Sequence, residues 1–374
     1  ALRSVLVIVL ASVAGAQDDG DWPQFRRDAA LSGSAATPLG DELELKWSVP
    51  LGFSVESSPA IVGGSVYATS LPGILVKLNL QDGEELWRYR PGADDAEVDG
   101  FEEDRFGESS PAVADGIVFA GDLMGILHAV DAESGEVRWR FATGAEIKSS
   151  PVIIGDRVLI GSYDGYLYGL AIADGALLWK YETFNYVHAT PAIWDGIAYF
   201  GGCDELFHGV RISDGAEVVS LSAGAYTAAS PVIIDGKIFF GTFDNEVLGI
   251  DLATQTLLWH YEHPQRHFPF YSSALAVAGT IVIGGRDKMV HAIDEQTGEG
   301  RWTFTTQARV DSSPAASGNR VYAGSSDGRL YVLDLTTGEK LWEFDAAAPL
   351  VASPAIAQSR LVIGSEDGVL YCFG

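Results

Sequence analysis

The chain has 374 residues, 47% of them hydrophobic, and a formal net charge of −27 at pH 7. Such an acidic surface repels nucleic acid and anionic lipid headgroups, which excludes both as partners. The length is sufficient for one large domain with a substantial core.

The first element in chain order is a segment typical of a secretory signal peptide, residues 1–16. Arg3 supplies the positive charge, residues 5–13 form an apolar stretch, and residues 14–16 are a small-residue cleavage site. The apolar stretch is too short to cross a bilayer. We therefore expect export to the periplasm or the exterior of a bacterium, with no transmembrane segment in the mature chain.

A lead-in segment, residues 17–42, is followed by a unit that recurs eight times and fills residues 43–374. Each unit opens on a Ser-Pro or closely related pair, mostly 40 residues after the previous one. The pairs begin at Ser58, Ser110, Ser150, Thr190, Ser230, Ser273, Ser313 and Ser353. A fixed period of this length is typical of solenoids and propellers.

Within a unit the apolar residues alternate with a period of two, as in β-strands. Residues 59–89 contain four short strands separated by turns that are rich in Gly and Asp, which predicts a four-stranded antiparallel meander. Four strands in about 40–45 residues is the size of a propeller blade. The chain is therefore predicted to be all-β, an eight-bladed β-propeller.

The two ends of the repeat array are complementary. The array starts on a single strand at residues 43–49 and finishes on the third strand of a unit, at residues 371–373. We expect the N-terminal strand to complete the last blade and close the ring, which removes two exposed sheet edges. An open β-solenoid is the alternative. In a closed ring Cys203 and Cys372 lie far apart, so two free thiols are predicted.

A large aromatic residue marks the last strand of nearly every unit. Tryptophan offers a wide flat apolar surface on which one sheet can pack against the next. The predicted blade-docking residues are Trp47, Trp87, Trp139, Trp179, Trp259, Trp302 and Trp342. Val219 stands at this position in one unit, where a thinner joint is expected.

The repeat resembles that of the pyrroloquinoline quinone (PQQ)-type propeller family. Residues 313–342 show the pattern most completely, with Ser313-Pro314, Asp327-Gly328, Thr337-Gly338-Glu339 and Trp342, and residues 21–28 resemble the family's lead-in. The resemblance implies one of two functions. Quinoprotein dehydrogenases hold PQQ with calcium, whereas BamB-like propellers are non-enzymatic and act in outer-membrane assembly through protein contacts.

The sequence favours the non-enzymatic branch. The adjacent cysteines typical of the dehydrogenases are absent, as is a haem attachment motif, and most connections from the Trp strand to the next Ser-Pro are short. We expect no cofactor, with a PQQ-dependent alcohol or sugar dehydrogenase as the alternative. A sugar-binding propeller is a third possibility that no motif selects.

An acidic insertion at residues 91–108 is the longest departure from the repeat. Asp95, Glu97 and Asp99 are spaced as in part of a calcium loop, but Phe106 stands where an EF-hand has its last ligand. These three carboxylates are candidate metal ligands, and a solvated acidic loop is the other interpretation.

Aromatic and basic residues gather in three consecutive connections that belong to one face of the ring. The predicted partner-binding residues are Phe184, Tyr186, His188, Tyr226, His263, Arg266, His267, Phe268 and Tyr271. Exposed aromatic side chains favour a binding site. Alternatively, His260, His263 and His267 bind zinc, or the aromatic rings plug the mouth of the central channel.

These features predict a secreted or periplasmic scaffold that binds a protein or peptide partner through its loop face. The partner is expected to be another envelope or secreted protein. The chain itself is expected to be a monomer or one subunit of a complex.

Overall fold

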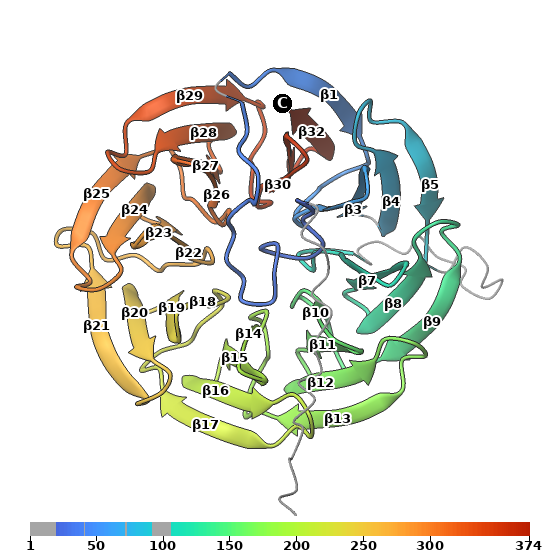
Figure 1. Cartoon of the computed structure of the whole chain (residues 1–374), viewed down its shortest axis with the longest axis horizontal. Helices are drawn as coiled ribbons and strands as arrows, with labels where there is room; N and C mark the ends of the chain where they lie inside the picture. The colour runs from blue at the N-terminus through green and yellow to red at the C-terminus, as the bar shows by residue number, and fades with distance from the viewer. Residues whose placement is uncertain (1–19, 41, 72, 92–105) are drawn as a thin grey trace, which may run out of the picture.

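The computed structural model describes residues 20–40, 42–71, 73–91 and 106–374. All regular secondary structure in these ranges is β-strand. The strands form eight four-stranded antiparallel sheets. The sheets are arranged around a central axis as the blades of a propeller (Figure 1). The predicted eight-bladed β-propeller is therefore confirmed.

Blades are numbered here in chain order, each from its inner to its outer strand. Blade 1 holds β2 (Ala60–Val62), β3 (Ser65–Ser70), β4 (Ile74–Asn79) and β5 (Glu85–Tyr89). Blade 2 holds β6 (Ala112–Ala114), β7 (Ile117–Gly121), β8 (Ile126–Asp131) and β9 (Val137–Ala142). Blade 3 holds β10 (Val152–Ile154), β11 (Arg157–Gly161), β12 (Tyr166–Ala171) and β13 (Leu177–Glu182). Blade 4 holds β14 (Ala192–Trp194), β15 (Ile197–Gly201), β16 (Leu206–Arg211) and β17 (Glu217–Ser222).

The second half of the ring continues the same pattern. Blade 5 holds β18 (Val232–Ile234), β19 (Lys237–Gly241), β20 (Glu246–Asp251) and β21 (Thr256–Glu262). Blade 6 holds β22 (Leu275–Val277), β23 (Thr280–Gly285), β24 (Met289–Asp294) and β25 (Gly300–Thr305). Blade 7 holds β26 (Ala315–Ser317), β27 (Arg320–Gly324), β28 (Arg329–Asp334) and β29 (Lys340–Asp345). Blade 8 holds β30 (Ala355–Ala357), β31 (Arg360–Gly364), β32 (Val369–Phe373) and β1 (Leu45–Pro50).

Blade 8 is closed by the N-terminal strand, as predicted. β1 pairs antiparallel with β32, with Trp47 opposite Cys372 and Val49 opposite Leu370. The backbone of Glu44 also exchanges two hydrogen bonds with that of Gly374, at 3.1 and 3.3 Å. The two ends of the array therefore satisfy each other's strand edge, and the ring needs no partner to close.

The apolar core is divided into layers between neighbouring blades. The layer between blades 2 and 3, for example, joins Phe119 and Trp139 to Ile160 and Leu170. Outer strands are buried at alternate residues, whereas the two middle strands of each blade are buried almost throughout. The expected alternation of buried and exposed residues is therefore found in the outer strands, whereas the middle strands are buried on both faces between neighbouring blades.

Each joint between blades pairs an aromatic ring with a turn of the next blade. Trp139 donates from its indole nitrogen to the carbonyl of Ile172 at 2.9 Å, and a Cβ on Gly175 (φ 71°) would lie 2.6 Å from its ring. Where Val219 replaces the tryptophan, the matching turn residue is Gln255, which takes a φ of 55°. A smaller side chain thus leaves room for a larger residue in the facing turn.

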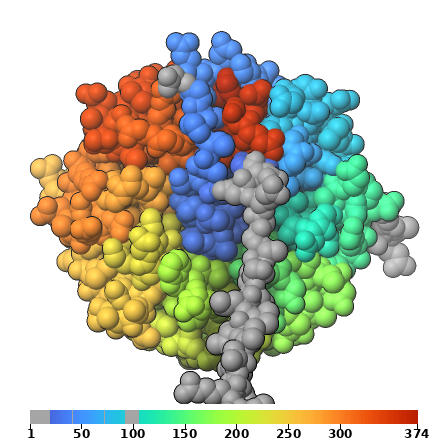
Figure 2. All heavy atoms as spheres, viewed as in Figure 1, coloured from blue at the N-terminus to red at the C-terminus, as the bar shows by residue number. Residues whose placement is uncertain are grey.

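The lead-in segment fills one end of the central channel, where it crosses the ring axis (Figure 1) and its blue atoms occupy the centre of the ring (Figure 2). N–H groups of the inner strands that face the channel donate hydrogen bonds to the lead-in segment. The donors are Ile61, Val113, Ile193, Ile233 and Ala316 to main-chain carbonyls at 2.6–3.0 Å, and Ile153 to the Gln24 amide oxygen at 2.9 Å. The lead-in therefore completes inner edges that would otherwise lack partners.

Two further expectations concern the cysteines and membrane spans. Cys203 and Cys372 are both free thiols, as predicted. The described ranges contain no helix that is long and apolar enough to cross a membrane.

Candidate functional site: the open mouth of the central channel

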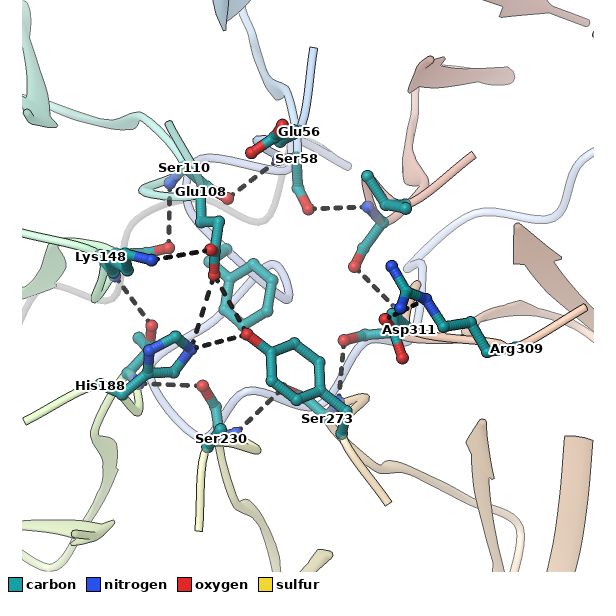
Figure 3. Close-up of a pocket in the computed structure, with 18 of the residues that line it drawn as sticks. Glu56, Ser58, Glu108, Ser110, Lys148, His188, Ser230, Ser273, Arg309 and Asp311 are labelled. Carbon is teal, nitrogen blue, oxygen red and sulfur yellow. Dashed lines mark hydrogen bonds and ion pairs between the residues drawn. The ribbon is translucent and has the colours of Figure 1, made fainter. Parts of the chain in front are cut away.

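A closed ring of hydrogen bonds joins the first residue of every Ser-Pro-type pair. The backbone N–H of each residue donates to the side-chain hydroxyl of its counterpart in the next blade, at 2.9–3.1 Å (Figure 3). The last bond runs from Ser353 to Ser58. Because all eight residues are buried, the bonds satisfy backbone groups that cannot reach bulk water. The repeated serine therefore acts between blades, a role that the period alone did not reveal.

These eight hydroxyls line a cavity of about 300 Å³ at the channel mouth opposite the lead-in's crossing. Phe25, from the lead-in, lines the same cavity. The lead-in thus forms part of the site as well as completing the inner strands.

The rim of the cavity is built from residues two positions before each hydroxyl. This position faces the axis in every blade but varies from blade to blade. Its residues, all of which line the cavity, are Glu56, Glu108, Lys148, His188, Ala228, Tyr271, Asp311 and Val351. The repeat therefore builds one wall of constant chemistry and one of variable chemistry.

Glu108 organises one side of the rim. Its carboxylate pairs with Lys148 at 3.3 Å and accepts a hydrogen bond from the Tyr271 hydroxyl at 3.3 Å. His188 lies between two tyrosines, with Nε2 3.2 Å from the Tyr271 oxygen and Nδ1 2.6 Å from the Tyr163 oxygen. Every donor finds an acceptor if Tyr163 donates to Nδ1, Nε2–H donates to Tyr271, and Tyr271 donates to Glu108.

Burial sets the charge of this cluster. Loss of solvent lowers the pKa of His188 below its ordinary value despite the nearby Glu108, so the imidazole is neutral at pH 7. Burial, followed by the charge of Glu108, raises the pKa of Tyr271 well above its usual range. The cluster therefore holds one carboxylate and one ammonium, with neutral rings between.

The remaining charges are distributed unequally around the mouth. Asp311 pairs with Arg286 and Arg309, both at 3.0 Å, and the Arg286 guanidinium lies 4.2 Å from the centre of the Tyr271 ring. Glu56 and Glu366 have no cation partner in the described part of the chain. Burial, together with nearby Glu108 and Glu366, raises the pKa of Glu56. One side of the mouth therefore carries two uncompensated carboxylates.

An aromatic groove of about 390 Å³ adjoins this mouth. We use this name for the surface lined by Tyr163, Asn185, Tyr186, His188, Cys203, Tyr226, Ala228, Phe243 and Tyr271. Tyr163 and Tyr186 stack with ring centres 4.7 Å apart and planes 11° from parallel. His188, Ala228 and Tyr271 line both the groove and the cavity, which makes the two surfaces continuous.

The groove brings together four of the nine predicted partner-binding residues: Tyr186, His188, Tyr226 and Tyr271. Tyr186 and Tyr226 are 50% and 51% exposed. Phe184, which is 91% exposed, does not line the groove but precedes it in the same connection.

The other four predicted residues lie in the connection from β21 to β22, and its basic groups are used internally. His267 bonds Glu262 at 2.5 Å, and Arg266 donates to the Asp287 carbonyl at 2.7 Å. His263 stacks edge-on against His291 with ring centres 5.7 Å apart, and Phe268 is 50% exposed. These four side chains therefore lie outside the groove, although Tyr271 of the same connection lines it.

Sequence reasoning missed Tyr163 and Phe243, although a signal for them exists. Each stands just before the Asp of the turn between the second and third strands, a position also occupied by Cys203, Arg286 and Glu366. All five line the cavity or the groove. Variation at this position, within an otherwise constant turn, marks the face that bears the cavity and the groove.

Three Tyr–His–Asp chains between neighbouring blades look like catalytic relays. Tyr89 of blade 1 bonds His128 of blade 2 at 3.0 Å, and His128 bonds Asp122 at 2.9 Å. The arrangement recurs around His208 of blade 4 and His291 of blade 6, each with a tyrosine from the preceding blade. All three histidines are buried. No reactant can reach them, so their role is to satisfy buried polar groups.

In the described ranges, no cluster of three or more His, Cys, Asp or Glu side chains could hold an ion. His260, the first histidine of the predicted zinc alternative, instead bonds Glu246 at 2.9 Å. Asp95, Glu97 and Asp99 lie outside the described residues.

A family model described as outer membrane protein assembly factor BamB matches residues 100–265 and 286–373, more than half of the chain. The chain belongs to the PQQ-type β-propeller family. Curated relatives include quinohemoprotein alcohol dehydrogenase ADH-IIG of Pseudomonas putida, 33% identical over 29% of this chain and 15% of its own length. BamB of Xanthomonas campestris pv. campestris is 30% identical over 27% of this chain and 26% of its own length. The chain thus matches about a quarter or less of each relative.

Solved structures show the same PQQ-type fold. BamB from Moraxella catarrhalis has a TM-score of 0.73 at 22% identity, covering 89% of this chain and 97% of its own. Quinohemoprotein alcohol dehydrogenase ADHIIG from Pseudomonas putida has a TM-score of 0.76 at 16% identity, covering 95% and 80%. At such identities the likeness concerns the fold alone, and it does not separate the two branches of the family.

The cavity of this PQQ-type propeller can be tested against the cofactor of the quinoprotein branch. PQQ is a tricarboxylate, and the resemblance implies that calcium accompanies it. Of the charged residues lining the cavity, Lys148, Arg286 and Arg309 are already paired with the chain's own carboxylates. Since Glu56 and Glu366 have no cation partner, a tricarboxylate without its metal would meet excess negative charge here. The described residues therefore offer PQQ alone no unpaired cation, whereas the two free carboxylates are of the kind that calcium takes as ligands.

Proposed function

We propose that this chain is a non-catalytic binding propeller of the bacterial envelope that holds a peptide, or a loop of another envelope or secreted protein, in the aromatic groove. The observation that carries this proposal is the groove itself. Five aromatic rings line it, and two of them are about half exposed. Exposed aromatic residues grouped around a concave surface are typical of binding sites.

The geometry suits an extended peptide. The groove runs beside the channel mouth, and its stacked Tyr163 and Tyr186 offer flat apolar area with hydroxyls at the edge. Phe184 and the loop bearing Phe268 flank the groove in sequence, and we propose them, with His263, Arg266 and His267, as outer contacts. The BamB relatives, named as assembly factors, support a protein partner in a complex.

The test is binding to an immobilised heptapeptide library by the purified chain and three variants. We expect the Tyr186→Ala/Tyr226→Ala double variant to lose at least tenfold in affinity, with its melting temperature unchanged. Trp194→Ala is the matched control, because Trp194 is 39% exposed and lies at the end of inner strand β14, on the lead-in's side of the ring. Phe268→Ala shows whether the contact extends to the β21–β22 loop.

Two results would overturn the proposal. One is the absence of any bound peptide, and the other is equal binding by the double variant and the parent chain. In parallel, a calorimetric titration with PQQ and calcium addresses the dehydrogenase alternative. Saturable one-to-one binding there would replace the scaffold with a quinoprotein, and a screen of alcohols and sugars would follow.

A further inference from the structure

The channel mouth has an excess of negative charge that the protein itself does not neutralise. Four carboxylates and three cations line the cavity, and each cation is engaged by Glu108 or Asp311. Glu56 receives only a hydrogen bond from the Ser54 hydroxyl at 3.2 Å, and Glu366 is exposed beside it. Carboxylates held next to each other without a cation favour a positively charged ligand.

The wall below these carboxylates also suits a cation. Each hydroxyl of the serine and threonine ring accepts one backbone N–H, and in the described chain none donates to a protein acceptor. Every oxygen therefore keeps a lone pair that can accept from an ammonium or guanidinium group, and an O–H that can donate to the backbone carbonyls of the same ligand. Phe25 adds an aromatic surface in the same cavity, and such surfaces attract cations.

The dimensions suit a single side chain. The cavity measures about 300 Å³, the low end for a small-molecule site, and the ring of inner strands encloses it. It opens into the aromatic groove through His188, Ala228 and Tyr271, which belong to both surfaces. A chain lying in the groove can therefore extend a side chain into the cavity without entering it.

We propose that the cavity is a socket for one basic side chain, Lys or Arg, of the peptide or loop that lies in the aromatic groove. This inference rests on the proposed function and specifies the chemistry of the partner. The charged end lies between Glu56 and Glu366 and within reach of the hydroxyl ring, while its aliphatic stem passes the aromatic rim. The formal charge of −27 steers a basic partner toward the chain.

An acidic ligand is disfavoured by the same observations. A carboxylate placed between Glu56 and Glu366 would be repelled by both, and each cation that lines the cavity already contacts Glu108 or Asp311. A neutral side chain would leave the two free carboxylates as they are. Between these two carboxylates, a cation gains an attraction that an acidic or a neutral side chain does not.

The experiment is a positional-scanning heptapeptide library, in which each position is fixed in turn as Lys, Arg, norleucine, Glu or Ala. Binding to the full purified chain is compared with that to Glu56→Gln/Glu366→Gln. We expect enrichment of Lys or Arg over norleucine at one position, and at least tenfold weaker binding of those peptides by the variant.

A matched control separates the socket from general electrostatic attraction. Glu299→Gln/Glu339→Gln makes the same change in net charge at two exposed turn residues far from the mouth. This control should bind basic peptides within about twofold of the parent chain, because distant surface charges are screened by salt. Melting curves of both double variants should match the parent.

Failure of the socket is distinguishable from failure of the groove. Peptides that bind through the groove without a preference for Lys or Arg, or that prefer Glu, overturn the socket and leave the proposed function standing. Equal losses in the two double variants also overturn it. If no peptide binds at all, both proposals are wrong.

Discussion

The two ends of the central channel are built from the same repeat, yet they differ in what occupies them. At one end the lead-in accepts hydrogen bonds from inner strands such as β2, β6 and β14 and fills the axis. At the other end, side chains from each blade point toward the axis and surround a cavity. At the first end, the chain's own lead-in satisfies the inner-strand edges and stabilises the fold. At the second end, the variable side chains around the cavity are available for binding.

The buried titratable groups at the two ends make the same contrast. Arg26 extends from the lead-in and donates to the carbonyls of Pro314 and Ala274, without a carboxylate partner at bonding distance. Burial lowers its pKa to about 9, so the guanidinium stays charged at neutral pH. His188 at the open end is buried and neutral. At the closed end, backbone carbonyls thus stabilise the charged guanidinium of Arg26. At the open end, two tyrosine hydroxyls bond the neutral imidazole of His188.

Removal of the lead-in should have the largest effect. A chain that starts at Glu42 loses the acceptors for six inner-strand N–H groups and exposes the apolar residues beneath them. At about 1 kcal/mol for each hydrogen bond, we expect the melting temperature to fall by about 10 °C or more. Differential scanning calorimetry measures the change.

The control for this truncation is a chain that starts at Gly20 and keeps every described lead-in contact. It should melt with the full-length protein. If the chain starting at Glu42 also melted with it, the lead-in would contribute nothing to stability, and the contrast between the two channel ends would be wrong.

A single substitution should produce the next largest effect. Gly33 lies against the Arg26 guanidinium with a φ of 68°, and a Cβ there would collide with the guanidinium. Gly33→Ala should therefore cost about 2–3 kcal/mol in unfolding free energy, since the buried arginine must give up its bonds to move. Urea unfolding monitored by tryptophan fluorescence gives the value.

Gly63→Ala provides the matched control. Gly63 also has a positive φ, 56°, but a Cβ there meets nothing within 4 Å. It measures the backbone strain alone. Equal costs for the two substitutions would show that Arg26 is not fixed in place.

The sequence predicted the ring because each repeat carries its own fold. Four strands, their turns and the Trp at each joint are local features, and the complementary chain ends fix closure. Even the exception can be read locally, since Val219 and Gln255 change together at one joint. Because the same local features recur in all eight units, they determine the whole ring.

The site was less predictable because it depends on residues that meet only when the ring closes. Ser58 and Ser353 are 295 positions apart and share a hydrogen bond. Phe25 precedes the repeats, so no comparison between units points to its place in the cavity. The composition of the histidine-rich β21–β22 loop favoured a binding role, but its polar side chains, such as Arg266 and His267, bond groups within the loop or in neighbouring elements. Variable positions within a constant repeat are a better guide than unusual composition.

The smallest expected effect is a difference in pH dependence between the two channel ends. His188 has a lowered pKa when folded, so between that pKa and about 6.5 the unfolded chain binds more protons than the folded one. Stability should therefore fall as pH decreases through this window. Arg26, with a pKa of about 9, does not titrate there, so the closed end is insensitive.

Urea unfolding at pH 7.5 and 5.5 tests this difference. His188→Asn should lose less stability between the two pH values than the parent chain does, because it no longer carries the buried imidazole. His260→Asn is the control, since His260 is exposed and pairs with Glu246 outside the cavity. If His188→Asn retained the parent's full pH dependence, the imidazole would have the same pKa in the folded and the unfolded chain. It would then be largely protonated at pH 5.5 and would place a positive charge between Glu108 and the tyrosines, which would offset part of the negative charge that the socket requires.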